Sequence, residues 1–94
     1  MSAELLIKKR DYFPKEDAFT SITVWAVDPS IRGSQHEYKY SLAYVVQGVC
    51  VMRYDNEAGK GDHKHIGDIE YPVSFSSLED LINQFFTDVN ILRR

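Results

Sequence analysis

Residues 55–65 read DNEAGKGDHKH, a dense group of side chains whose types are suited to chemistry. The stretch holds His63 and His65, two of the chain's three histidines, and it places Lys60 between two glycines. Such a stretch is compatible with a solvated turn, a metal site, a phosphate-binding loop or an acid–base centre. The spacing of its residues argues against one of these alternatives and leaves the other three open.

The spacing excludes a phosphate-binding loop of the Walker type. That loop has four residues between its glycines, followed by lysine, by serine or threonine, and by a helix. Here only Lys60 separates Gly59 from Gly61, and His63 follows soon after. The two glycines can still let backbone N–H groups approach a single phosphate beside Lys60.

A metal site is the second alternative. His63 and His65 alternate, so both imidazoles face the same side of a strand. With Asp55 or Glu57 they would offer a metal ion two imidazoles and a carboxylate. A His-x-His pair is also common in the absence of a metal. The sequence therefore favours a site without a metal or another cofactor.

Acid–base chemistry on RNA is the third alternative, and it stands beside the fourth, a polar hairpin loop whose histidines and lysines are simply solvated. Two imidazoles can act as general base and general acid near neutral pH, and a lysine can stabilise the charge on a pentavalent phosphorus. We therefore predict cleavage through the 2′-hydroxyl, with His63 and His65 as the acid–base groups and Lys60 against the phosphate. If both imidazoles lie on one side of the scissile bond, His36 or Tyr38 would supply the opposite role.

The other polar and aromatic side chains around this stretch are assigned to substrate contact or to holding the loop. Tyrosine rings can stack on unpaired bases, and lysines can meet phosphates. The predicted substrate contacts are Lys39, Tyr40, Tyr54, Lys64, Gly59 and Gly61. The predicted loop anchors are Asp55, Asn56, Glu57 and Asp62. Asp62 is expected to orient an imidazole.

The composition is that of one small soluble domain. The 94 residues are 44% hydrophobic and 27% charged, so residues 1–94 are expected to form a single domain with one modest core. Neither a membrane span nor a secretory signal is expected, and Cys50, the only cysteine, is expected to be a buried thiol, so we expect a cytoplasmic location. The net charge of −3 argues against a protein that coats nucleic acid, but it allows a local basic patch.

The hydrophobic pattern predicts an antiparallel sheet followed by a helix. Strands are expected at 4–10, at 20–27 and on both sides of Gln47-Gly48, which is typical of a two-residue hairpin turn. A fifth short strand is expected between His63 and Glu70. The predicted fold is an α+β domain, in which a four- or five-stranded antiparallel sheet carries one C-terminal helix on one face.

Helical spacing begins near Ser76, where Ser76 and Glu79 fit a capping box. The apolar positions expected to pack the helix on the sheet are Leu78, Leu81, Ile82, Phe85 and Val89. Alternation across the hairpin places Ala43, Val45, Cys50 and Met52 on one face, and their small or adaptable side chains suit a position under the helix. The stripe of Tyr40, Leu42 and Tyr44 would then lie on the other face. A partner, a ligand or a second copy of the chain could cover it, or the twisted sheet could curl and bury this face on itself.

The residues from His36 to Pro72 resemble the TumE family of toxins from toxin–antitoxin systems. The family pattern runs as His-x-Tyr-Lys-Tyr, a hairpin, Tyr-Asp-Asn-Glu, Gly-Lys-Gly-Asp-His, a further His, Gly-Asp and a Pro. The matching positions are His36, Tyr38, Lys39, Tyr40, residues 54–57, residues 59–63, His65, Gly67, Asp68 and Pro72. The N-terminal AELL and the C-terminal helix also fit, so the resemblance spans nearly the whole chain.

The resemblance implies a short cytosolic toxin encoded beside a helix-turn-helix antitoxin. It leaves the chemistry open. A metal-independent endoribonuclease is the function we expect. The alternatives are a toxin that modifies nucleotides and a non-catalytic module that binds its target, or a second copy of itself, through an exposed face of the sheet.

Overall fold

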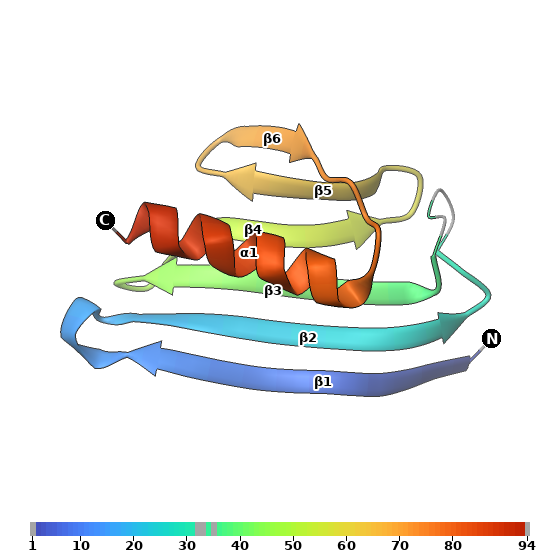
Figure 1. The fold of residues 1–94 in the computed structure, drawn as a ribbon, viewed down its shortest axis with the longest axis horizontal. Coiled ribbons are helices and arrows are strands. Elements are labelled where there is room, and N and C mark those ends of the chain that lie inside the picture. The colour runs from blue at the N-terminus through green and yellow to red at the C-terminus, as the bar shows by residue number, and fades with distance from the viewer. Residues whose placement is uncertain (1, 32–33, 35, 94) are drawn as a thin grey trace.

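Six antiparallel strands form one sheet, in which each strand pairs with the next one along the chain (Figure 1). The computed structural model describes residues 2–31, 34 and 36–93. The strands are β1 (Ser2–Phe13), β2 (Ala18–Asp28), β3 (Tyr38–Val46), β4 (Val49–Glu57), β5 (Gly61–Ile66) and β6 (Ile69–Pro72). A 3-10 turn, Pro14–Glu16, joins β1 to β2, and the helix α1 covers Leu78–Leu92.

The α+β class and the single C-terminal helix are confirmed, but the number of strands is not. The region expected to form one short strand forms both β5 and β6, because the chain reverses at Gly67, whose φ is +59°. Gln47 and Gly48 also have positive φ, as the predicted hairpin turn requires. The β1–β2 connection has no glycine, and Asp17 takes the left-handed conformation there instead.

The helix begins one residue later than a capping box at Ser76 would place it. The Oγ of Ser77 accepts a hydrogen bond of 3.0 Å from the backbone N–H of Asp80, so Ser77 is the N-cap. Ser76 donates instead to the carboxylate of Asp80, at 2.9 Å. The predicted cap was therefore wrong by one position, although serine performs the expected role of satisfying a free backbone donor.

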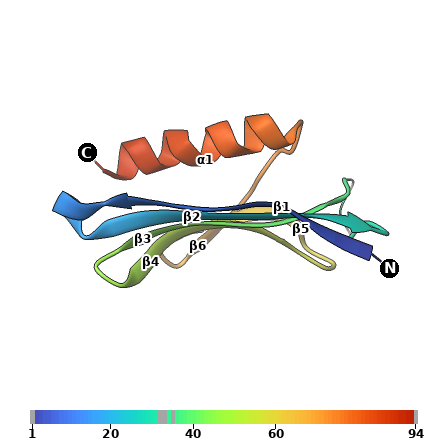
Figure 2. The ribbon, with the colours of Figure 1, turned by 90° about the horizontal axis from the view of Figure 1, so that it is seen from below.

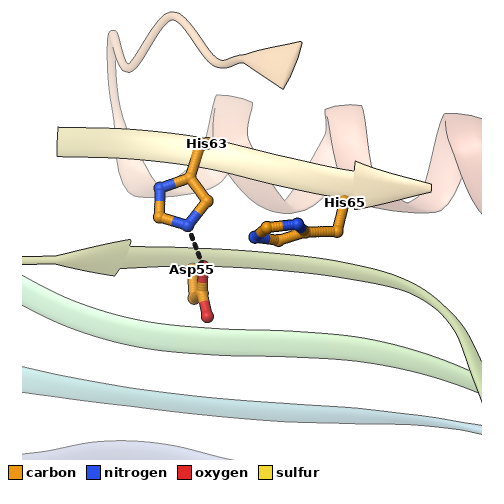
Figure 3. Close-up of side chains that lie close together, drawn as sticks. All are labelled: Asp55, His63 and His65. Atoms are coloured by element: carbon orange, nitrogen blue, oxygen red, sulfur yellow. Dashed lines mark ion pairs between the residues drawn. The ribbon is translucent and has the colours of Figure 1, made fainter. Parts of the chain in front are cut away.

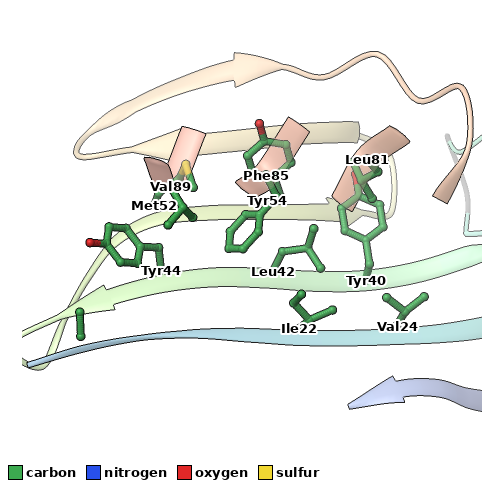
Figure 4. Packing of buried hydrophobic residues seen from close by; sticks show 11 residues of the cluster. Ile22, Val24, Tyr40, Leu42, Tyr44, Met52, Tyr54, Leu81, Phe85 and Val89 are labelled. Atoms are coloured by element: carbon green, nitrogen blue, oxygen red, sulfur yellow. The ribbon is translucent and has the colours of Figure 1, made fainter. Parts of the chain in front are cut away.

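The apolar stripe of α1 packs on the centre of the sheet (Figure 4). Leu81, Phe85 and Val89 are buried, and Leu78 and Ile82 are partly buried against the same core, as predicted. The sheet contributes the buried side chains Ile22, Val24, Tyr40, Leu42, Tyr44, Met52 and Tyr54. The large side chains thus lie under the helix, where they remove the most apolar area from water.

The predicted assignment of the two faces was wrong. The stripe of Tyr40, Leu42 and Tyr44 is buried under α1, so it offers no surface to a partner. The error arose because small side chains were expected under the helix, whereas the large ones lie there. A bulge between Tyr44 and Val45 accounts for Met52 alone, since Tyr44 pairs with Met52 while Val45 pairs with Cys50. The extra residue on β4 moves Met52 to the face of Tyr44, which simple alternation from the turn does not predict.

The opposite face of the sheet is covered by no described helix or strand, and we call it the open face (Figure 2). Cys50 is exposed near the β3–β4 turn, so its expected place in the core was also wrong. Within the described ranges, no helix is long and apolar enough to cross a membrane.

Candidate active site

Alternation along β5 sends the side chains of residues 62–65 to opposite faces. Directly opposed residues of neighbouring strands share a face. Asp55 pairs with His63, and Arg53 pairs with His65. Their neighbours along the strands, Tyr54 and Lys64, face the helix, so these four residues face away from it. The two imidazoles therefore lie on the open face, whereas Asp62 and Lys64 lie on the helix side.

His63 and Asp55 form a close pair on the open face (Figure 3). Nε2 of His63 lies 2.7 Å from Oδ1 of Asp55, and the His63 side chain is only 4% exposed. The distance is that of an ion pair, but the two atoms do not meet hydrogen-bond geometry, and neither has another hydrogen-bond partner among the described residues. Nδ1 of His63 lies 3.1 Å from the carbonyl oxygen of Gly61.

His65 completes this cluster, and it is the imidazole that a substrate can reach. Its ring lies edge-to-face with that of His63, with 5.0 Å between the centroids, and it points toward the Asp55–His63 pair in Figure 3. A ligand atom from each of Asp55, His63 and His65 lies within 4.8 Å of the others. His65 and Arg53 also line a shallow hollow together with Val51 and Gly67. We call Asp55, His63 and His65 the open-face cluster.

Further carboxylates and a lysine surround the open-face cluster. Nε2 of His63 lies 3.7 Å from Oε1 of Glu70 and 3.9 Å from Oε1 of Glu57. Lys60, which is about half exposed, has its Nζ 3.6 Å from Glu70. The backbone carbonyl of Glu57 accepts a hydrogen bond of 3.0 Å from the backbone N–H of Lys60, and this closes the tight β4–β5 turn. Lys60 therefore lies at the rim of the cluster.

A second histidine–carboxylate pair lies on the helix side. Nε2 of His36 is 2.8 Å from Oδ1 of Asp62, and the hydroxyl of Tyr40 donates to the same oxygen at 2.6 Å. The ring of His36 stacks on Phe75 with 3.9 Å between centroids. Asp62 thus orients an imidazole, as expected of it, but the imidazole is that of His36. His36 therefore lies on the face opposite to that of His63 and His65.

Three of the predicted substrate contacts, Tyr40, Tyr54 and Lys64, lie on the helix side of the sheet. Tyr40 and Tyr54 are 1% and 0% exposed, so neither ring can stack on a base in this conformation. The hydroxyl of Tyr54 and the Nζ of Lys64 both bond to Asp88 of α1, the lysine at 2.7 Å. Burial, followed by the hydrogen bond to Asp88, raises the pKa of Tyr54 above its ordinary value. Tyr54 and Lys64 thus hold the helix on the sheet.

The remaining predicted residues support the β4–β5 hairpin. Asn56 is buried, where its side chain accepts from the N–H of Tyr40 and donates to the carbonyl of Tyr38, as a loop anchor should. Lys39 lies on the open face and donates to the carbonyl of Asn56. Tyr38 is half-buried beside Phe75. Gly59 and Gly61 have φ of +84° and +75°, which the turn around Lys60 requires.

Two rows of side chains cross the open face through the cluster. The His65 row consists, from β1 to β6, of Arg10, Ser21, Ala43, Arg53, His65 and Glu70. The His63 row consists of Lys8, Thr23, Ser41, Asp55, His63 and Pro72. Small side chains thus separate the cations of β1 from the cluster, and they form a shallow floor between them.

These rows contain residues that the sequence analysis missed. Lys8, Arg10 and Arg53 join Lys39 as cations of the open face, and Trp25, which pairs with Lys39, leaves 38% of its surface exposed there. The alternation of Lys8 with Arg10, and of Arg53 with Asp55, was the available signal. It could be used only once the buried face of each strand was known.

Comparison with known proteins supports one family. The sequence model of the family described as Toxin TumE matches residues 3–93, which is nearly the whole chain. Searches of curated proteins and of solved structures returned no match.

Proposed function

The chain belongs to the TumE family of toxins, so it is the toxin of a toxin–antitoxin pair, and we propose that it acts by cleaving RNA on the open face of its sheet. The observation that carries this proposal is the meeting of two features on one uncovered surface. The open-face cluster supplies groups for proton transfer, and Lys8, Arg10, Lys39 and Arg53 supply cations for phosphates.

The shape of the open face suits a single strand of RNA. Arg10 and Arg53 belong to the same row and lie three strands apart, or roughly 14 Å, and the floor between them is Ser21 and Ala43. Exposed aromatic rings, such as Trp25 and Tyr12, lie on the same face for stacking with unpaired bases. A phosphate beside Arg53 would lie next to the imidazole of His65.

The reaction proposed is transesterification through the 2′-hydroxyl. The open-face cluster takes the proton of the 2′-hydroxyl while its oxygen bonds to the adjacent phosphorus and the bond from phosphorus to the 5′ oxygen breaks. The 5′ oxygen takes a proton from solvent. Arg53 and Lys60 stabilise the charge that develops on the phosphate oxygens. The products are a 2′,3′-cyclic phosphate and a 5′-hydroxyl.

Mass spectrometry of RNA incubated with the purified toxin tests this proposal. Cleavage as proposed yields fragments that end in a 2′,3′-cyclic phosphate, and the His65→Ala variant yields none. An intact RNA of increased mass would instead assign the toxin to the nucleotide-modifying class. Intact RNA of unchanged mass, with growth arrest preserved in cells, would favour the non-catalytic binding module.

Variants of β1 test the open face as the RNA surface, because neighbouring residues of this strand point to opposite faces. Arg10→Ala should weaken binding to a single-stranded oligonucleotide and reduce the slope of log affinity against log salt by about 0.7 for each phosphate that the side chain neutralises. Lys9→Ala is the matched control, since Lys9 pairs with Ile22 on the helix side and is also well exposed. Equal effects of the two changes would contradict this surface.

We also propose that the antitoxin is a helix-turn-helix protein encoded beside the toxin. The support for this type of antitoxin is the family resemblance of the chain. The neighbouring reading frame and co-purification of the two proteins test it. A neighbouring product of another fold that neutralises the toxin would overturn this part of the proposal.

A further inference from the structure

The open-face cluster has the chemistry of a metal site. We propose that Asp55, His63 and His65 bind one divalent transition-metal ion of the zinc type. Zinc sites that act in catalysis use three protein ligands of this kind and leave a position open to water or substrate. Magnesium is not the expected ion, because it prefers oxygen ligands alone.

The geometry already brings the ligand atoms close to the positions that an ion requires. One atom from each residue lies within 4.8 Å of the others. Ligand atoms at about 2.0–2.2 Å from a shared ion lie roughly 3–4 Å from one another, so small side-chain rotations would close the site. His63 and His65 come from alternate positions of β5, and Asp55 is the cross-strand partner of His63, so the backbone holds all three on one face.

The hydrogen bonding of His63 prepares Nε2 as a ligand. Nδ1 lies 3.1 Å from the Gly61 carbonyl, which can only accept, so Nδ1 carries the proton. In the neutral imidazole, Nε2 then presents a lone pair toward Asp55. Histidine ligands of metal ions are commonly fixed in this way, by a carbonyl that accepts from the other ring nitrogen.

The two buried atoms that face each other have no hydrogen-bond partner among the described residues. Nε2 of His63 and Oδ1 of Asp55 are 2.7 Å apart, yet neither meets hydrogen-bond geometry with any described group. Two acceptor atoms at this distance repel each other unless a positive charge lies between them or beside them. A bound cation removes the repulsion and satisfies both atoms at once.

The surroundings also favour a cation. The carboxylates of Glu57 and Glu70 lie within 4 Å of Nε2 of His63, and together with Asp55 they outnumber the two nearby cations, Lys60 and Arg53. His65 and Asp55 are only partly buried, so the ion would keep a position open to the hollow beside Arg53. When the three side chains bind the ion they no longer accept the proton of the 2′-hydroxyl, so in the reaction proposed above the ion would acidify that hydroxyl in their place or hold a phosphate oxygen. This role, unlike binding itself, rests on the proposed function.

Calorimetric titration of the tag-free, chelator-treated chain with zinc chloride tests the site without any RNA. The expected result is one equivalent bound per chain, with no comparable binding of magnesium chloride. Asp55→Ala, His63→Ala and His65→Ala should each lower the zinc affinity at least 10-fold, whereas His36→Ala should leave it unchanged. Absence of binding by the wild type, or equal affinity in all four variants, would overturn the proposal.

A spectroscopic measurement keeps the test independent of variants that fold poorly. In the wild-type chain, zinc should shift the imidazole NMR signals of His63 and His65 and leave those of His36 in place. A shift of His36 alone would contradict the site. If the chain binds zinc but leaves RNA intact, the proposed function fails and the metal site stands. If the chelator-treated chain binds no zinc and still cleaves RNA, the metal site fails and the metal-independent mechanism expected from the sequence is favoured.

Discussion

Nε2 of His63 lies 2.7 Å from Oδ1 of Asp55 on the open face of the sheet, and neither atom meets hydrogen-bond geometry with a described partner. On the helix side, the pair of His36 and Asp62 has a similar separation of 2.8 Å, but it is built into a network with Tyr40. The two histidine–carboxylate pairs therefore differ in whether their facing atoms have hydrogen-bond partners. The His36–Asp62 pair stabilises the fold, and the His63–Asp55 pair has unused capacity to bind or to react.

The first prediction concerns the helix that holds this arrangement together. Leu81→Ala or Phe85→Ala should lower the free energy of unfolding by about 2–5 kcal/mol, because each side chain is 0% exposed and its removal leaves a cavity in the core. Ile91, on the same helix, is 57% exposed, and Ile91→Ala should change stability by no more than about 0.5 kcal/mol. Urea titration followed by circular dichroism measures all three. A large loss in Ile91→Ala would mean that α1 packs through another face.

The second prediction separates the two serines before α1. Ser77→Ala removes the acceptor for the N–H of Asp80 and should cost about 0.5–2 kcal/mol of stability. Ser76→Ala removes only an exposed bond to the Asp80 side chain and should cost much less. Thermal melting of the two variants at equal concentration compares them. A larger loss of stability in Ser76→Ala than in Ser77→Ala would instead support the capping box at Ser76 that the sequence predicted.

The third prediction follows from the buried tyrosine on β4. Because the pKa of Tyr54 is raised on folding, unfolding becomes easier as its phenol ionises in the unfolded chain. The stability from this shift is fully present below about pH 10, and it is lost progressively above that pH. Stability should therefore fall less steeply between about pH 10 and 11 in Tyr54→Phe than in the wild type. Urea titrations at several pH values measure the slope, and equal slopes would contradict the shift.

Much of this fold could be predicted because its signals are local. The helical stripe from Leu78 to Val89 and the turn at Gln47-Gly48 are both set by a few neighbouring residues. The face assignment failed because alternation separates the two faces of a strand without showing which one the helix covers, and one extra residue on β4 also moved Met52 to the buried face. The separation of β5 from β6 was missed because a single glycine turn interrupts a short polar segment.

The candidate site was predictable in composition but not in arrangement. His63 and His65 were expected as acid–base groups and Asp55 as a loop anchor or, in the metal alternative, a ligand, and the structure brings the three side chains together. The sequence could not show that His36 and Tyr40 meet Asp62 on the other face, or that Tyr54 and Lys64 are held by Asp88 of the helix. Such contacts join residues that are distant along the chain, and no local pattern encodes them.

The comparison of two histidine variants in cells tests the central claim most directly, namely that toxicity comes from the open face. His65→Ala and His36→Gln are each induced without the antitoxin, growth is measured, and circular dichroism of the purified proteins confirms folding. Loss of an acid–base or ligand group should slow the reaction by about 10²–10⁴-fold, so His65→Ala should no longer arrest growth. His36→Gln should melt at a lower temperature and still arrest growth. Arrest by folded His65→Ala, together with its loss in folded His36→Gln, would contradict the account.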